Sequence, residues 1–177
     1  MVNISPNIVA IQMNSSPRVD DNLAFVEQQL KLLPIQKPCL VVLPECFACF
    51  GGDEKSVLDI AEDLHLGPIQ HKLKQLAKQY DIWLVAGSLP VLCPIANKFT
   101  ASCLLINEHG KIVEEYQKIH LFDVKVADDT GTYLESRNTQ AGNKLIVIST
   151  PFGVLGLAIC YDIRFAGMFI AMNQIAQ

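Results

Sequence analysis

The apolar run Gly153-Val-Leu-Gly-Leu-Ala-Ile159, followed at once by Cys160-Tyr-Asp-Ile-Arg-Phe165, is the stretch that decides the fold of this chain. The pattern predicts a buried strand that turns directly into a helix. Cys160 would then lie where the strand ends and the helix begins, and the first N–H groups of the helix would favour the reactive thiolate. The position marks Cys160 as a candidate nucleophile. The alternative is a buried cysteine that acts as a small hydrophobic residue.

Two other polar residues directly follow predicted strands. Cys39-Leu-Val-Val-Leu-Pro44 is continuously apolar, which predicts a strand buried on both faces, and Glu45 follows it. Lys111-Ile-Val-Glu-Glu-Tyr-Gln117 alternates apolar and polar residues, which predicts a strand with one wetter face, and Lys118 follows it. If these strands share a sheet with the one before Cys160, the acid, the ammonium and the thiol meet at one sheet edge. The alternative is an ordinary ion pair at a strand end.

Three separate motifs carry these residues in a fixed order. They are Val41-Val-Leu-Pro-Glu-Cys46, Tyr116-Gln-Lys-Ile-His-Leu-Phe-Asp123 and Gly156-Leu-Ala-Ile-Cys-Tyr-Asp-Ile-Arg-Phe165. Together they resemble the nitrilase superfamily of carbon-nitrogen hydrolases, whose catalytic glutamate, lysine and cysteine come in this chain order. Ala10-Ile-Gln-Met13, Val85-Ala-Gly-Ser88 and Tyr133-Leu-Glu-Ser136 are also similar to the family. The resemblance extends from about Ile8 to Phe165.

The resemblance implies an α/β fold, the α-β-β-α sandwich of carbon-nitrogen hydrolases, with Glu45, Lys118 and Cys160 as catalytic residues. It also implies a thioester mechanism, in which Glu45 takes the thiol proton and Cys160 attacks a carbonyl. Lys118 and a backbone N–H near Tyr161 would stabilise the negative oxygen, and Glu45 would then activate the water that cleaves the thioester. In this family Glu135 would be a second acid that holds the lysine. The alternative interpretation of Glu135 is an ordinary exposed loop glutamate.

Other polar residues of the motifs have narrower roles. Asp162 and Arg164 are expected to fix the turn after the nucleophile, and Arg164 is also a candidate for binding a substrate carboxylate. His120 is expected to pack beside the site, because the glutamate already supplies the base. Cys46-Phe-Ala-Cys49 matches a metal or redox motif, but no second pair stands at a matching spacing. The chemistry requires neither a metal nor another cofactor.

Lys118-Ile-His-Leu-Phe-Asp-Val124 followed by Tyr133-Leu-Glu-Ser136 is most similar to the Nit branch, the deaminated-glutathione amidases and omega-amidases. This resemblance implies an amidase that releases ammonia from a small carboxylate-bearing amide of a 2-oxo acid. One alternative is another branch: an aliphatic amidase, a carbamoyl-amine hydrolase or a nitrilase. From other classes, a noncatalytic truncated remnant and a thioredoxin-like protein built on Cys46 and Cys49 remain open. A homodimer is expected for the full-length form.

The composition narrows the partners and the location. With 50% hydrophobic and 18% charged residues the chain is less charged than typical domains, which have about 25% charged residues. The net charge of -4 and the lack of a basic cluster exclude nucleic acid as the expected partner. No apolar stretch reaches the ~20 residues that span a bilayer, so no membrane contact is expected. Cysteines within apolar runs, without a signal peptide, indicate the cytoplasm.

Two features depart from the family pattern. Arg164-Phe-Ala-Gly167 stands where the family has Arg-Phe-Pro-Glu, and the chain stops at Gln177, early in the helix after the nucleophile. Family members continue with further strands and helices, so the resemblance implies that residues 1–177 are the N-terminal portion of a single domain with an incomplete sandwich. Expressed alone, the chain is expected to be inactive and poorly soluble, with its pocket open on one side.

Periodicity and turn residues predict the remaining elements. Helices are expected at 18–33, briefly around 53–64, and from Gly67-Pro68 onward. Strands are expected at 7–13 and 82–87, and a hairpin joins 98–107 to 111–117. The polar segment 119–143, which holds Asp128, Asp129, Gly131 and Glu135, is expected to be a long loop that walls the pocket. A second hairpin, 145–149 with 154–159, precedes a helix from about Ile163.

Overall fold

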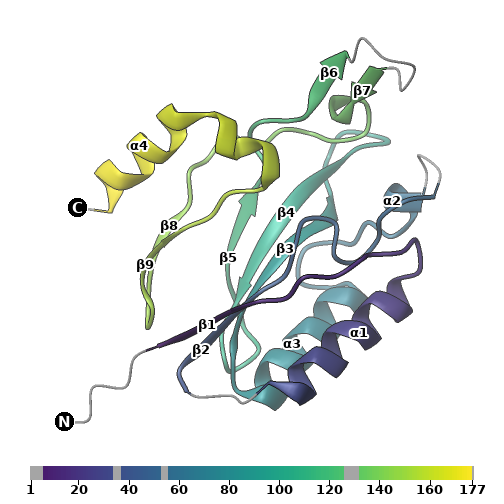
Figure 1. Cartoon of the computed structure of the whole chain (residues 1–177). Helices are drawn as coiled ribbons and strands as arrows, with labels where there is room; N and C mark the ends of the chain where they lie inside the picture. Colours follow the sequence, from purple (N-terminus) through teal and green to yellow (C-terminus); the bar gives the residue numbers. More distant parts are fainter. Residues whose placement is uncertain (1–5, 34–36, 53–55, 126–131, 177) are drawn as a thin grey trace.

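A five-stranded mixed sheet lies at the centre of the molecule (Figure 1). The computed structural model describes residues 6–33, 37–52, 56–125 and 132–176. The strands stand side by side in chain order, and the first three are parallel whereas the last two are added as an antiparallel meander. The strands are β1 (Asn7–Ala10), β2 (Cys39–Val42), β3 (Trp83–Leu92), β4 (Phe99–Ile106) and β5 (Ile112–Gln117).

Two helices cover one face of this sheet, α1 (Val19–Leu32) and α3 (Pro68–Tyr80). Each places apolar residues at helical spacing toward the sheet, such as Val26 and Leu30 on α1 and Leu73 on α3, and all three are at most 1% exposed. Burying a side chain of this size contributes about 1.5–3 kcal/mol, so these faces anchor the helices. The short helix α2 (Ser56–Asp59) lies in the connection between β2 and α3.

The opposite face of the sheet packs against the C-terminal part of the described chain. This part contains a two-stranded ribbon of β8 (Val147–Thr150) and β9 (Gly153–Gly156), a 3₁₀ helix (Cys160–Arg164) and α4 (Ala166–Ile175). Sheet residues such as Leu105 and Tyr116 share a buried cluster with Ile159 and Met168. The layers therefore follow the order helix, sheet, ribbon, helix, as the α-β-β-α prediction requires (Figure 1).

The predicted hairpin before Cys160 is present as β8 paired with β9, but its second strand is shorter and more exposed than predicted. Within the described residues β9 pairs with β8 in a separate ribbon and not with the five-stranded sheet, and it ends at Gly156. Most of it is exposed, and only Leu157 and Ile159 of the following residues are buried. The thiol therefore reaches the site from a turn that faces the sheet, and not from a strand end of the same sheet. The α-helix also starts later than predicted, at Ala166.

The segment predicted as a long loop is partly ordered into a second ribbon. Strands β6 (Asp123–Lys125) and β7 (Thr132–Leu134) pair antiparallel, and a 3₁₀ helix (Glu135–Arg137) follows them. Asp128, Asp129 and Gly131 lie outside the described residues, as does the start of the helix predicted around 53–64, of which α2 is the described part. None of the helices in the described ranges is long and apolar enough to cross a membrane.

Candidate active site

Lys118 is the centre of a buried charge cluster. It directly follows β5, and its side chain is only 1% exposed. Its Nζ donates hydrogen bonds to Glu45 Oε1 at 2.8 Å and to Glu135 Oε1 and Oε2 at 3.0 and 2.9 Å. Burial acts to lower the pKa of Lys118, but the hydrogen bonds to the two carboxylates outweigh burial and raise the pKa. The side chain is therefore an ammonium at neutral pH.

Glu135 is held in place by the backbone as well as by the lysine. Its Oε2 accepts a hydrogen bond from the Phe122 N–H at 2.6 Å, and its own N–H donates to the Phe122 carbonyl at 3.3 Å. Glu135 is the first residue of a 3₁₀ helix, and its side chain is 23% exposed. Glu135 is therefore held both by Lys118 Nζ and by the backbone of Phe122, whereas a freely exposed loop glutamate would lack these contacts.

A close approach between the segment after β2 and the middle of β3 positions Glu45. The backbone after β2 passes so near Gly87 that a Cβ at Gly87 would lie 1.7 Å from the Pro44 carbonyl oxygen. Cys46, the residue after Glu45, has a φ of 54° and donates its N–H to Ser88 Oγ at 2.8 Å. Only glycine at position 87 lets the two segments touch, and this contact aims the Glu45 side chain at Lys118.

Cys160 begins its 3₁₀ helix with a φ of 44°, in the left-handed region. Such backbone costs a residue with a Cβ of the order of 1–3 kcal/mol and persists only where the surroundings impose it. Partial burial of the sulfur, its hydrogen bond with Glu45 and the charge of that carboxylate raise the pKa of the Cys160 thiol, while Lys118 acts in the opposite direction. The sequence pattern predicts a favoured thiolate. The structure instead favours the thiol, so attack by Cys160 would require a base.

Asp162 is the group that imposes this turn. It is completely buried, and its Oδ2 accepts hydrogen bonds from Tyr116 Oη at 2.6 Å and from the Ile159 N–H at 2.9 Å. Its Oδ1 accepts from the His120 N–H at 3.0 Å and from His120 Nδ1 at 2.7 Å. Asp162 therefore fixes the turn around Cys160, as expected, and ties it to the segment that carries Lys118.

The four groups open onto one cavity of about 600 Å³, lined by Glu45, Lys118, Glu135 and Cys160. Its walls combine aromatic and apolar side chains with a few polar ones, which suits a small organic molecule. The sequence analysis did not single out most of this wall, although part of it follows Glu135 directly in the chain. The further lining residues include Phe50, Val57, Phe99, Phe122, Tyr133, Arg137, Asn138 and Thr139.

Two candidate residues lie differently from Glu45, Lys118 and Cys160. Arg164, the candidate carboxylate binder, is exposed and is absent from the cavity lining in the described part of the chain. Arg137 lines the cavity instead. Tyr161 follows Cys160 within the 3₁₀ helix, and its ring packs edge-on against Phe122, with the ring centroids 5.0 Å apart. The backbone N–H of Tyr161 thus lies in the turn that carries the nucleophile.

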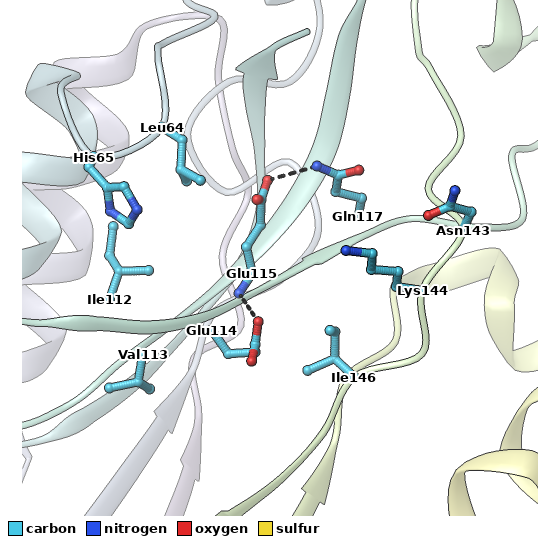
Figure 2. A pocket seen from close by; sticks show the side chains of 10 residues that line it. All are labelled: Leu64, His65, Ile112, Val113, Glu114, Glu115, Gln117, Asn143, Lys144 and Ile146. Carbon is cyan, nitrogen blue, oxygen red and sulfur yellow. Dashed lines mark hydrogen bonds between the residues drawn. The ribbon is translucent and has the colours of Figure 1, made fainter.

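A second cavity of about 530 Å³ lies along β5, outside this site (Figure 2). Figure 2 shows Glu115, Gln117 and Lys144 around it, with Gln117 Nε2 donating to Glu115 Oε1 at 3.4 Å. Ser102 Oγ also donates to that carboxylate, at 2.6 Å, so Glu115 is engaged within the protein. The described lining holds no cysteine and shares no residue with the thiol cavity. The Cys160 cavity is therefore the candidate reaction site.

Cys46 and Cys49 also line the thiol cavity, as free thiols. Burial and the neighbouring Glu45 charge raise the pKa of Cys46 to about 11, which keeps it protonated at neutral pH. Among the described residues, no group of three or more histidine, cysteine, aspartate or glutamate side chains gathers as a metal site would require.

Comparison with known proteins places these residues in a family context. The family model described as carbon-nitrogen hydrolase matches residues 7–175. Deaminated glutathione amidase of Yersinia enterocolitica is 38% identical over 170 residues, covering 94% of this chain and 58% of that protein. Omega-amidase Nit3 of Saccharomyces cerevisiae is 33% identical over 165 residues, covering 89% and 56%. The crystal structure of the C. elegans NitFhit protein superposes with a TM-score of 0.80 at 29% identity, covering 94% of this chain and 40% of that one. The chain thus spans 58% or less of each of these proteins.

Proposed function

The chain belongs to the carbon-nitrogen hydrolase family, and on that premise we propose that it acts as an amidase with Cys160 as the nucleophile. One observation carries the proposal. The Lys118 ammonium is held between Glu45 and Glu135, and the Cys160 thiol, whose pKa the nearby Glu45 helps to raise, opens onto the same cavity. A base, a cation and a nucleophile thus surround the space that an amide carbonyl would fill.

In the first half of the reaction, Glu45 takes the proton of the Cys160 thiol while the sulfur forms a bond to the amide carbon. The raised pKa of the thiol makes this proton transfer necessary. The carbonyl oxygen becomes negative, and the Lys118 ammonium with the Tyr161 N–H stabilises it. Removing one such donor typically costs about 2.7–4 kcal/mol of barrier height.

In the second half, Glu45 returns its proton to the leaving nitrogen, the carbon–nitrogen bond breaks, and ammonia departs. An acyl group then remains on the sulfur of Cys160 as a thioester. Glu45, again a carboxylate, takes a proton from a water whose oxygen attacks the thioester carbon. The carbon–sulfur bond breaks, Glu45 returns the proton to the sulfur to restore the thiol, and the product is a carboxylic acid.

The proposed substrate is a small amide that also carries a carboxylate, such as the monoamide of a 2-oxo acid. Relatives named deaminated glutathione amidase and omega-amidase support this choice. Arg137 lines the cavity and offers a planar guanidinium, which suits a carboxylate. We also propose a homodimer for the complete protein, which light scattering of that protein would test.

A substrate panel tests this function. With the complete protein, ammonia release from a 2-oxo acid monoamide should exceed release from propionamide or propionitrile by more than about tenfold, because a hydrogen bond to a charged group contributes about 1.5–3 kcal/mol. Arg137→Gln should reduce the ratio between these rates of ammonia release. Cys160→Ala gives the background rate. Equal rates on propionamide and the oxo-acid amide would instead indicate an aliphatic amidase. No release from any amide or nitrile would contradict the proposal.

A further inference from the structure

The carboxylate of Asp162 joins the two segments that carry Lys118 and Cys160. Asp162 is two residues after Cys160, and its hydrogen-bond donors Tyr116 and His120 stand two residues before and two residues after Lys118. The three side chains therefore link the segment that carries Lys118 to the segment that carries Cys160. None of them belongs to the described lining of the cavity.

We propose that Asp162, with Tyr116 and His120, is a positioning cluster that sets the place of the Cys160 thiol relative to Lys118 and Glu45. The cluster touches neither substrate nor the reacting atoms, and it acts only through Cys160. The inference rests on the proposed function in one respect, the assignment of Cys160 as the nucleophile.

The backbone around Cys160 supports this role. Asp162 Oδ2 accepts from the Ile159 N–H at 2.9 Å, and the Asp162 N–H donates to the Ile159 carbonyl at 3.0 Å. These two hydrogen bonds join Ile159 to Asp162, and Cys160 lies between these two residues in the chain. With a φ of 44°, Cys160 needs such an external constraint. If the carboxylate were lost, the turn would relax toward an ordinary backbone conformation.

The donors of the cluster are themselves held in place. Burial, together with the Asp162 carboxylate, raises the pKa of Tyr116, so its hydroxyl remains a donor. That hydroxyl also accepts from the Ile119 N–H at 3.2 Å. The His120 ring stacks on Phe165, with centroids 3.6 Å apart and an interplanar angle of 10°. The cluster is thus rigid enough to transmit position, and a misplacement of about 1 Å at a reacting group can cost about 100-fold in rate.

The alternative role for a buried carboxylate is stability alone, and Glu62 provides the matched control for that role. Glu62 is 7% exposed and accepts hydrogen bonds from the Ile69 N–H at 2.6 Å and from Gln70 N–H and Nε2, both at 3.1 Å. These bonds hold the start of α3. Glu62 is absent from the described cavity lining, so its loss affects folding without touching the turn of Cys160.

The test compares Asp162→Asn with Glu62→Gln in the complete protein by thermal unfolding, amidase kinetics and iodoacetamide labelling of Cys160. Both variants should unfold at lower temperature. Below that temperature, Asp162→Asn should lose about 100-fold in kcat with KM little changed, whereas Glu62→Gln keeps its kcat. Labelling across pH reports the apparent pKa of Cys160, which faces Glu45, Lys118 and Glu135. That pKa should fall toward the ordinary value only in Asp162→Asn.

A second pair of variants covers the case in which Asp162→Asn does not fold. His120→Asn keeps a side-chain donor for Asp162 and should retain more kcat than His120→Ala, whereas equal kcat values would contradict the proposal. Folded Asp162→Asn with wild-type kcat and an unchanged labelling profile would overturn it. If the wild-type protein turns over no amide, the proposed function fails, and the labelling profile alone decides the positioning role.

Discussion

At the scale of single residues, partial burial of the sulfur and the charge balance of the site both raise the pKa of Cys160 and favour its thiol form. Glu45 and Glu135 are both within 3.0 Å of Lys118 Nζ, so the cluster of two carboxylates and one ammonium already carries one net negative charge. A resting thiolate would add a second negative charge beside Glu45, and like charges disfavour ionisation. In the proposed mechanism, the thiol proton therefore moves to Glu45 during the reaction and not before it.

This argument predicts a labelling profile. In wild-type protein, the rate of alkylation of Cys160 by iodoacetamide should rise with pH with an apparent pKa above 9.0, the ordinary value. In Glu45→Gln the apparent pKa should fall, because the hydrogen bond and the charge that raise it are removed. Peptide mass spectrometry separates Cys160 from the other cysteines, and Cys160→Ser gives the background. A wild-type pKa below 9.0 would instead indicate a resting thiolate paired with Lys118.

At the scale of secondary-structure elements, the contact between the end of β2 and β3 decides where Glu45 lies. A Cβ on Gly87 would lie 1.7 Å from the Pro44 oxygen. We therefore expect Gly87→Ala to force the segments apart, lowering the unfolding free energy by about 1–3 kcal/mol, as overpacking does. The kcat should fall by about 100-fold, because Glu45 moves with Pro44.

Gly167→Ala is the control for that substitution. Gly167 lies in α4, and a Cβ there meets no atom of the described structure within 4 Å. Alanine favours a helix over glycine, so this variant should unfold at an equal or higher urea concentration and keep its kcat. Urea unfolding and ammonia release measure both variants. A Gly87→Ala variant that behaves like Gly167→Ala would show that the close approach does not position Glu45.

Several elements were predictable because one local pattern determined each. Apolar spacing predicted α1, the Gly67-Pro68 pair marked the start of α3, and the continuous apolar run before Glu45 predicted β2. The hairpin before Cys160 was predicted, but the end and the exposure of its second strand were not, because an apolar run does not reveal which of its residues are buried. The glycine-rich residues Gly153–Gly156 form an exposed ribbon, and burial begins only at Leu157.

The candidate site, like the fold, could be predicted only in part from the sequence. The motifs brought Glu45, Lys118, Glu135 and Cys160 into consideration, and the structure places these side chains around one cavity. The hydrogen bonds of the Asp162 cluster were not predictable, since Tyr116 appears in the sequence only as a buried residue of a strand. Arg137 was overlooked for a related reason. Its place on the cavity wall depends on the fold of the whole segment that follows β5.

At the scale of the whole molecule, the C-terminal elements expose several large apolar side chains. Ile163 of the 3₁₀ helix is 74% exposed, and Ile170 and Ile175 of α4 are 62% and 58% exposed. Exposed apolar side chains can recruit other chains. Residues 1–177 expressed alone should therefore self-associate, and light scattering after gel filtration should show a mass that rises with concentration. Ile170→Lys should reduce this association.

Leu66→Lys is the control for the association measurement. Leu66 is 81% exposed but lies just before α3, the helix that covers the sheet face opposite α4 (Figure 1). The substitution adds the same charge to the molecule, so it should leave the association nearly unchanged. If residues 1–177 remain a monomer at every concentration, or if both variants reduce association equally, the exposed apolar side chains around α4 are not its cause.

The central claim, that Cys160 forms the thioester, can be tested by trapping the acyl enzyme. The complete protein is mixed with the oxo-acid amide, quenched in acid during turnover and digested for peptide mass spectrometry. The predicted result is a mass increase equal to the substrate minus ammonia on the peptide that contains Cys160, absent in Cys160→Ala, which should also release no ammonia. An adduct on Cys46 or Cys49, with Cys160→Ala still active, would contradict the account.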